Sequence, residues 1–351
     1  MSIAVNMQKT KIRLEESPYT YVRTTVMRTL LIPKQDYPKL LKMSISEISN
    51  YLGQTQYKKE IDELGVEFSG IELVEQALKK NFIHTVEKLK RISPKSFNYL
   101  IDAYLMKYDI ENIKTMIRGK AAKLSFEELQ KLLFPVGVLS ITDLQTMWKK
   151  ENTEEMVKSL PEPLNLFHEK YKRIDDKKLI NVETSLDHFY FQQILEFAKR
   201  IPRQGALFKE FLFEIINTTN LLTYLRLKKE GLQNEEIKKH IFPTTNQRLL
   251  FQQLLKVNDY GKIKEIILKS KYKDTLGDME LMNNISLIPM EMKLSRYLLR
   301  KTLLFQHQNP LSVYVILSYL FAKEIEIQNI RRIVKAKHFG LEIEKTGMVI
   351  A

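Results

Sequence analysis

Apolar residues recur three and four positions apart along most of the chain, separated by Lys, Glu and Gln. This spacing places apolar side chains on one face of an α-helix. One such stripe consists of Ala103, Met106, Ile110, Ile113 and Ile117. The most apolar run, 311–322, is shorter than the ~20 residues that span a bilayer, so we interpret it as a buried helix. With only 11 glycines and 11 prolines to interrupt it, this pattern predicts an all-α fold.

The chain contains one sequence unit three times, because residues of the same type recur 108 positions apart. Each copy has a glutamate on a first helix and a proline after that helix. The glutamates are Glu75, Glu183 and Glu291, and the prolines are Pro94, Pro202 and Pro310. A proline has no N–H and a fixed φ, which suits the first turn of a helix. We therefore predict that a second helix starts at each proline.

The second helix carries a recurring Asn, followed by two basic residues. These positions are Asn112, Arg118 and Lys120 in the first copy, Asn220, Arg226 and Lys228 in the second, and Asn329, Lys335 and Lys337 in the third, which is shifted by one residue. Asn is unfavourable inside a helix, so its recurrence predicts a specific hydrogen bond, more readily between helices than to a ligand. The basic residues are typical of a solvated face, and contact with a partner is the less favoured alternative.

These matches predict an N-terminal arm at 1–18 and three helical repeats at 19–137, 138–245 and 246–351. A recurring leucine, at Leu124, Leu232 and Leu341, follows the second helix of each copy. The segments 36–64, 143–173 and 244–281 resemble one another less but are also helical in pattern. Each repeat is therefore predicted to be a small bundle of helices.

The composition favours a chain that folds without disulfides in a reducing compartment. Hydrophobic residues make up 44% of the 351 residues, and cysteine is absent. The first 22 residues are interrupted by charges, so we expect no export signal there. The formal net charge is +14, which favours a negative partner such as nucleic acid, anionic lipid or an acidic protein surface. A lysine-rich solvated surface explains the charge equally well.

Catalytic motifs are missing from the sequence. It has no phosphate-binding loop of the Walker type, no dinucleotide-binding glycine motif, no zinc-protease motif and no nucleophile elbow. The six histidines are scattered without metal-ligand spacing, and the paired carboxylates lie in polar stretches. We therefore predict no catalytic, cofactor-binding or metal-binding residues and no cofactor. Because Lys and Arg alternate with Glu along the chain, nucleic-acid binding is only an alternative.

Three segments resemble the C subunit of the V/A-type rotary ATPases, which is itself similar to the d subunit of the eukaryotic V-ATPase. They are Tyr19-x-Tyr21-Val22-Arg23, Tyr57-Lys58-Lys59-Glu60-Ile61, and Pro310-Leu311-Ser312 followed by Ile325-x-Ile327-x-Asn329-Ile330-Arg331-x-Ile333-x-Lys335. The likeness extends from Tyr19 to Leu341 and agrees in order, spacing and repeat phase. The third copy departs from the others by one residue, which leaves the packing of its last helices open.

The resemblance implies a non-catalytic, funnel-shaped protein with three helical subdomains around a pseudo-threefold axis. It implies that the open end receives a central shaft of subunits D and F, and that the other face rests on the membrane rotor ring. Torque from the A and B subunits would then pass through the chain and drive H⁺ or Na⁺ transport, at the cytoplasmic face of the membrane. A helical-repeat scaffold of another complex and a basic nucleic-acid-binding protein are the alternatives.

Overall fold

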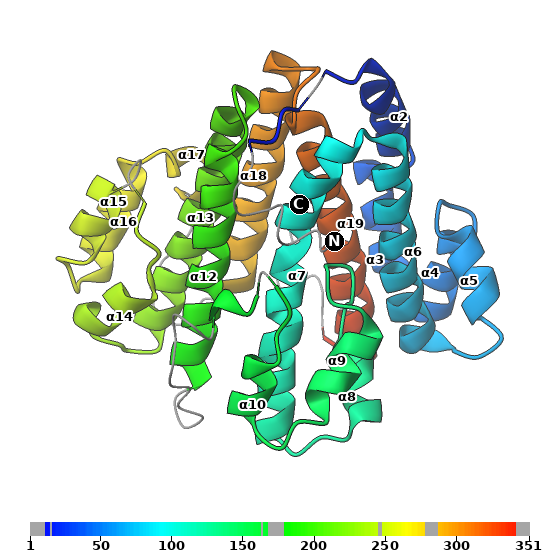
Figure 1. Cartoon of the computed structure of the whole chain (residues 1–351). Helices are drawn as coiled ribbons and strands as arrows, with labels where there is room; N and C mark the ends of the chain where they lie inside the picture. The colour runs from blue at the N-terminus through cyan, green and yellow to red at the C-terminus, as the bar shows by residue number, and fades with distance from the viewer. Residues whose placement is uncertain are drawn as a thin grey trace. The chain divides into compact units, whose positions relative to one another are not determined.

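The computed structural model describes residues 11–14, 16–162, 164–167, 179–244, 248–277 and 287–341. Every regular element in these ranges is helical, which confirms the predicted all-α class (Figure 1). The boundaries of the three repeats remain predictions.

The helices of the first half of the chain are α2 (Pro18–Thr29), η1 (Lys34–Asp36), α3 (Tyr37–Lys42), α4 (Ile45–Leu52), α5 (Lys58–Leu64), α6 (Gly70–Ile92), α7 (Lys95–Ala121), α8 (Phe126–Leu132), α9 (Ile141–Trp148) and α10 (Thr153–Lys158). Those of the second half are α12 (Leu179–Lys199), α13 (Gln204–Lys229), α14 (Asn234–His240), α15 (Arg248–Leu254), α16 (Tyr260–Leu268), α17 (Lys273–Leu276), α18 (Leu287–Gln308) and α19 (Tyr314–His338).

The described residues form two compact units. The first unit comprises 11–17 and 85–209, and the second comprises 18–84 and 210–341. One boundary lies at the start of α2, and the other two fall within α6 and α13, so each of the latter helices contributes to both units.

Helix α7 is the centre of the first unit. Its buried residues lie on nearly every side of the helix, beyond the single stripe that the sequence predicts. Helix α12 packs along α7, and α8 contacts its C-terminal part (Figure 1). The short helices α8 and α9 begin at capping boxes, in which Ser125 pairs with Glu128 and Ser140 with Asp143. Such boxes satisfy the free N–H groups of a first turn, so these helix starts are encoded locally.

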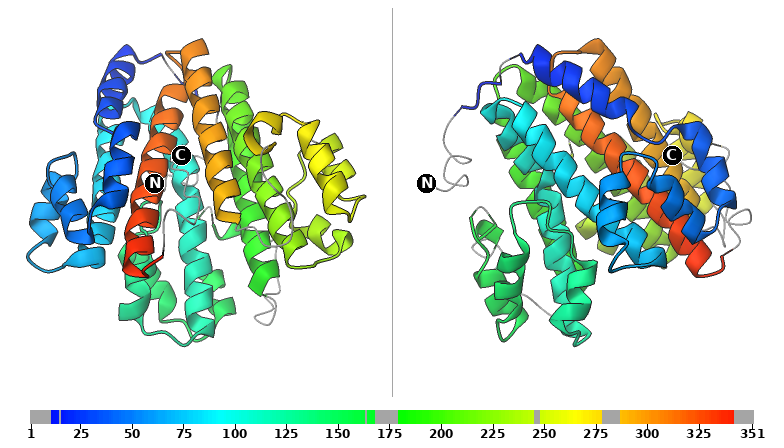
Figure 2. Two further views of the ribbon diagram at one scale, coloured as in Figure 1. Left: turned by 180° about the vertical axis from the view of Figure 1, so that it is seen from behind. Right: turned by 90° about the vertical axis from the view of Figure 1, so that its right-hand side faces the viewer.

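Helix α19 occupies the corresponding position in the second unit. It is buried along almost its whole length, including the segment 314–327. Helix α18 packs along it, and α2 and α4 also contact it (Figure 2). The predicted buried helix at 311–322 is therefore present, although α19 begins at Tyr314.

A further core in the second unit joins the C-terminal part of α13 to α14, α15, α16 and α17. It includes Leu221 and Tyr224 of α13, Ile237 of α14 and Leu254 of α15, and the hydroxyl of Tyr224 donates a hydrogen bond to the carbonyl of Leu254. The short helices thus depend on tertiary packing, because helices of a few turns are marginal alone in water.

The three long helices α7, α13 and α19 end in the same way. Each is followed by a residue with positive φ, at Lys123 (54°), Gly231 (83°) and Gly340 (63°). The next residue is the recurring leucine, whose N–H donates to a carbonyl five positions earlier in each case. This is a Schellman ending, in which the left-handed position favours glycine. The first copy therefore places a lysine at a position where the other two have glycine.

The three long helices begin less uniformly than the prolines predict. Pro94 directly precedes α7, as expected for a helix start. Pro202 lies two residues before α13, and Pro310 lies four residues before α19. In these two copies the proline belongs to the turn that leads into the helix.

Candidate functional site

The recurring glutamates and basic residues meet at packing seams between helices. In the first unit, Nε and Nη2 of Arg118 on α7 donate to the two carboxylate oxygens of Glu183 on α12, both at 2.6 Å. This bidentate geometry is the strongest form of an arginine–carboxylate pair. The hydrogen bonds to Glu183 raise the pKa of Arg118 above its ordinary value. Deeper in the same seam, the buried Lys114 donates to Asp187 at 2.9 Å.

The second unit contains an equivalent seam between α19 and α6. Nζ of Lys335 lies 3.3 Å from Oε1 of Glu75, and Nε of Arg331 lies 3.9 Å from the same oxygen. The neighbouring Lys79 is buried, and its burial, together with the positive charge of Arg331, lowers its pKa to about 8. In both seams the basic residue therefore comes from the second helix of one predicted repeat and the glutamate from the first helix of another.

The third recurring glutamate has a different partner. Glu291 on α18 accepts a hydrogen bond from Nη2 of Arg332 on α19 at 2.5 Å, a contact within the third predicted repeat. Arg226 of the second copy is exposed on α13, and no ion pair joins it to another residue within the described ranges. The structure thus brings the recurring charges together in two seams and does not do so for the Arg226–Glu291 pair.

The recurring asparagines bind backbone groups. The side-chain amide of Asn112 donates to the carbonyl of Phe134 at 2.9 Å and its oxygen accepts from the N–H of Phe134 at 2.7 Å. Asn220 forms the same pair of bonds with Phe242, at 2.8 and 3.0 Å. In both copies the partner is the backbone just after the short helix, so the asparagine joins that segment to the long helix. Asn329 in the third copy is also buried.

A second set of buried polar residues lies one turn before the asparagines and is missed by the sequence analysis. These residues are Asp109, Asn217 and Glu326. The carboxylate of Asp109 accepts hydrogen bonds from the N–H groups of Val138 and Leu139, at 2.9 and 3.0 Å. The signal was available, because each polar residue stands three positions before a recurring asparagine.

Burial determines the protonation of Asp109. Its carboxyl has no solvent exposure, and burial raises its pKa to about 7 against the opposing effect of the two N–H donors. The loop must approach closely, because a Cβ at Gly137 would collide with the Asp109 carboxylate. A larger residue at this position would have to displace the Asp109 carboxylate.

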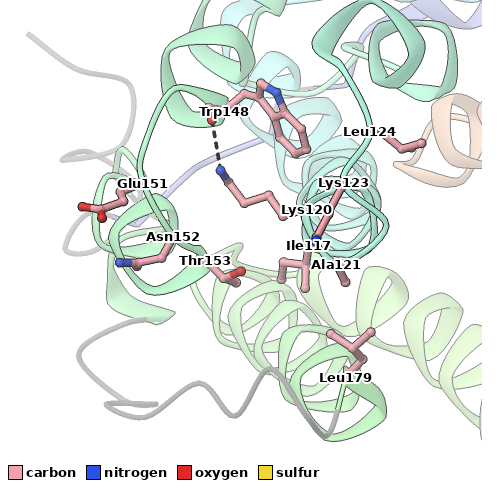
Figure 3. A pocket seen from close by; sticks show the side chains of 10 residues that line it. All are labelled: Ile117, Lys120, Ala121, Lys123, Leu124, Trp148, Glu151, Asn152, Thr153 and Leu179. Carbon is pink, nitrogen blue, oxygen red and sulfur yellow. Dashed lines mark hydrogen bonds between the residues drawn. The ribbon is translucent and has the colours of Figure 1, made fainter.

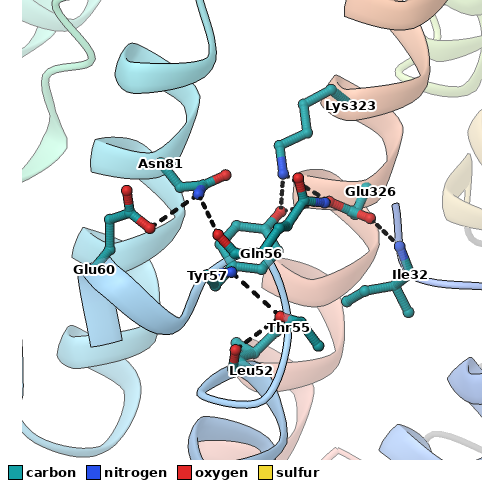
Figure 4. A network of polar contacts seen from close by, with 9 residues as sticks. All are labelled: Ile32, Leu52, Thr55, Gln56, Tyr57, Glu60, Asn81, Lys323 and Glu326. Atoms are coloured by element: carbon teal, nitrogen blue, oxygen red, sulfur yellow. Dashed lines mark hydrogen bonds and ion pairs between the residues drawn. The ribbon is translucent and has the colours of Figure 1, made fainter. Parts of the chain in front are cut away.

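Glu326 is the centre of a buried network in the second unit (Figure 4). Its carboxylate accepts hydrogen bonds from the hydroxyl of Tyr57 at 2.6 Å, from Nζ of Lys323 at 2.9 Å and from the amide of Gln56 at 3.1 Å. The backbone N–H of Ile32 donates to its other oxygen. Lys323 also donates to the Tyr57 hydroxyl at 2.9 Å, and burial lowers its pKa. This network ties three segments of the unit together, from α19, from the loop after α2 and from the loop before α5.

The recurring lysines bind oxygen atoms near the ends of short helices. Lys120 donates to the carbonyls of Trp148 and Lys150, at 3.1 and 2.8 Å, and its ammonium lies 4.7 Å from the centre of the Trp148 ring. Lys337 donates to the carbonyl of Leu41 at 2.7 Å, near the end of α3. Lysines in such positions donate hydrogen bonds to the free carbonyls at a helix C-terminus and interact favourably with the helix dipole.

Lys228 is the exception among the three lysines. It donates to the side-chain oxygens of Asn234 and Asn258, at 2.9 and 2.7 Å. It nevertheless joins the end of α13 to the segments that follow, as Lys120 does for α7, whereas Lys337 joins the end of α19 to α3.

A recess of about 400 Å³ opens beside Lys120 in the first unit (Figure 3). The C-terminal end of α7, the Trp148 ring and the start of α10 line it, and Leu179 closes one side. Among the described residues that line it, the only carboxylate is that of the exposed Glu151. Its lining therefore provides no buried pair of ionisable groups for acid–base chemistry.

Within the described ranges, no group of three or more His, Asp or Glu residues could hold a metal ion. In the same part of the chain, no helix combines the length and the apolar character that crossing a bilayer requires.

Comparison with known proteins assigns the family. The model of the ATP synthase (C/AC39) subunit family matches residues 20–347. The C subunit of the A-type ATP synthase of Methanosarcina mazei is 31% identical over 335 residues, covering 95% of this chain and 92% of the relative. The same protein of Methanococcoides burtonii is 32% identical over 333 residues, covering 93% and 92%. That of Archaeoglobus fulgidus is 31% identical over 337 residues, covering 95% and 96%.

The site residues and the comparisons together indicate one class of protein. The recurring polar residues bind one another and the backbone, as in a helical protein whose role is structural. The chain belongs to the ATP synthase (C/AC39) subunit family, which confirms the resemblance found in the sequence. It is a non-catalytic subunit of a rotary ATPase complex.

Proposed function

We propose that this chain is the central-stalk subunit that links the shaft, formed by subunits D and F, to the membrane rotor ring. In this role it transmits torque between the A and B subunits of the catalytic head and the ring, in ATP-coupled transport of H⁺ or Na⁺. It lies at the cytoplasmic face of the membrane as a peripheral subunit.

The recurring seam pairs are the observation that carries this proposal. Arg118 of the first predicted repeat binds Glu183 of the second, and Lys335 of the third binds Glu75 of the first. Contacts of this head-to-tail kind between similar units close into a ring when the rotation allows it. We therefore propose that the repeats 19–137, 138–245 and 246–351 surround a pseudo-threefold axis and form a funnel that receives the shaft.

Stiffness and charge support the same role. Close-packed helices deform little under load, and buried networks such as the one around Glu326 resist rearrangement. The net charge of +14 suits a position beside anionic lipid headgroups and acidic protein loops. Attachment to the ring is then expected to weaken as salt screens these charges.

The test is a pull-down from gently solubilised membranes, with every co-purifying chain identified by mass spectrometry. Recovery of D, F and ring subunits together with A and B would support the linker role. A second preparation, washed at high salt before the pull-down, should lose ring subunits before it loses D and F. Recovery of unrelated soluble proteins or of nucleic acid alone would reject the proposal and favour a scaffold or a nucleic-acid-binding protein.

A further inference from the structure

Helix α2 and Leu30, the residue directly after it, carry a stripe of apolar side chains that faces solvent, which we call the α2 stripe. Tyr19, Val22, Val26 and Leu30 are each more than half exposed, at 62%, 55%, 52% and 51%. The buried residues of the helix are Thr20, Thr24 and Met27, on another side from the stripe, and the helix contacts α19. Isolated exposed apolar residues are common, but a continuous stripe of them marks an interaction surface.

The spacing of the stripe indicates the shape of the partner. The intervals of three, four and four residues are those of the narrow seam along which two helices pack. The seven residue steps from Tyr19 to Val26, at about 1.5 Å each, give the helical part of the stripe a length of roughly 10 Å, or two turns, and Leu30 extends it beyond the helix end. The other exposed residues of α2 are Pro18 at its start and the polar Arg23 and Thr29. A helix that inserts into a membrane surface has a wider apolar face.

The charges around the stripe indicate the chemistry of the partner. Helix α2 contains two arginines and no acidic residue, and the exposed Arg23 lies beside Val22 and Val26. Beyond Leu30, the positive charges of Arg296 and Arg300 on α18 are close enough to lower the pKa of Lys34. A surface that concentrates positive charge beside an apolar seam is complementary to a seam flanked by carboxylates.

We propose that the α2 stripe, formed by Tyr19, Val22, Val26 and Leu30, binds an amphipathic helix of another subunit whose apolar seam is flanked by Asp and Glu. The proposal rests on membership of the rotary ATPase complex and goes beyond the linker role, which names no residue of this chain that contacts a partner.

Site-specific crosslinking in the assembled complex tests this proposal. Because the chain has no cysteine, Val22→Cys introduces a unique thiol that can carry a photoreactive group. Val66→Cys is the matched control, since Val66 is 92% exposed on a loop of the same unit. The group at position 22 is expected to react with a helical, Asp- and Glu-rich segment of another subunit. Reaction with lipid, or with no chain in an intact complex, would overturn the proposal.

A charge substitution provides the second measurement. Val26→Glu places a carboxylate in the stripe, and because Val26 is exposed, the helix should fold unchanged. Crosslinking from position 22 is expected to fall at least tenfold in this variant and to be unaffected by Val66→Glu. The native chain is also sedimented with phosphatidylglycerol vesicles. If it binds them and Val26→Glu abolishes this binding, the stripe contacts a membrane surface, and the proposal is overturned.

The two proposals fail in different ways. If the Val66→Cys chain recovers no ATPase subunit, the linker role fails. If that chain recovers the complex while position 22 reacts with no subunit, only the α2 proposal fails.

Discussion

Replacing Lys123 with glycine should stabilise the protein. Lys123 has φ of 54° at the end of α7, where the equivalent residues after α13 and α19 are Gly231 and Gly340. A left-handed backbone costs a non-glycine residue about 1 to 2 kcal/mol, through contact of Cβ with the carbonyl oxygen. Glycine also stabilises the unfolded chain, because its backbone has more conformational freedom there, and this offsets about 0.4 to 1 kcal/mol of the gain. The expected net gain in unfolding free energy is about 1 kcal/mol.

The assay is urea unfolding followed by circular dichroism, with amide hydrogen exchange at Leu124 as a local probe. The Leu124 N–H donates to the carbonyl of Gly119, so its protection reports directly on the helix ending. Lys123→Ala is the matched control, because it removes the exposed side chain and keeps the Cβ. Gly231→Lys should have the opposite effect, with a loss of about 1 kcal/mol. Equal stability of Lys123→Gly and Lys123→Ala would refute the backbone-strain explanation.

Three further outcomes follow from the seams and the buried groups. Arg118→Glu should destabilise the first unit by about 1 kcal/mol, since the pair is partly exposed, and adding Glu183→Arg should restore most of this loss in urea unfolding. Glu326→Gln should cost about 3 kcal/mol, because it leaves Lys323 buried without its carboxylate, and an undiminished urea midpoint would contradict this. Burial raises the pKa of Asp109 to about 7 in the folded state, whereas the carboxyl of the unfolded chain titrates near its ordinary value of 3.8. The folded state therefore binds a proton between these two values, and the stability that this proton contributes is lost as the pH rises from about 4 to 7. The difference in unfolding free energy between the native chain and Asp109→Asn should therefore decrease across that pH range. A difference that stays constant with pH would exclude the raised pKa of Asp109.

Local sequence signals were sufficient to predict the all-α fold class and the family of this chain. The three- and four-residue spacing of apolar side chains records which face of a helix is buried, so it predicts helices without knowledge of their neighbours. Capping boxes such as Ser125 with Glu128 act within one turn and can be read directly. The recurrence of Asn112 at Asn220 marked a residue with a specific hydrogen bond, although its partner, the Phe134 backbone, was not predictable.

Only the tertiary structure decided which recurring residues meet. Arg118 and Glu183 are 65 positions apart, and Tyr57 and Glu326 are 269 positions apart, so their contact depends on how whole helices pack. The sequence presents three equivalent glutamates, yet Glu291 binds Arg332 and Arg226 stays exposed. It likewise does not reveal that Thr20 and Thr24 of α2 are buried while its apolar stripe lies in solvent. Periodicity specifies the conformation and faces of each helix, whereas the choice of partner depends on packing free energies summed over the whole unit.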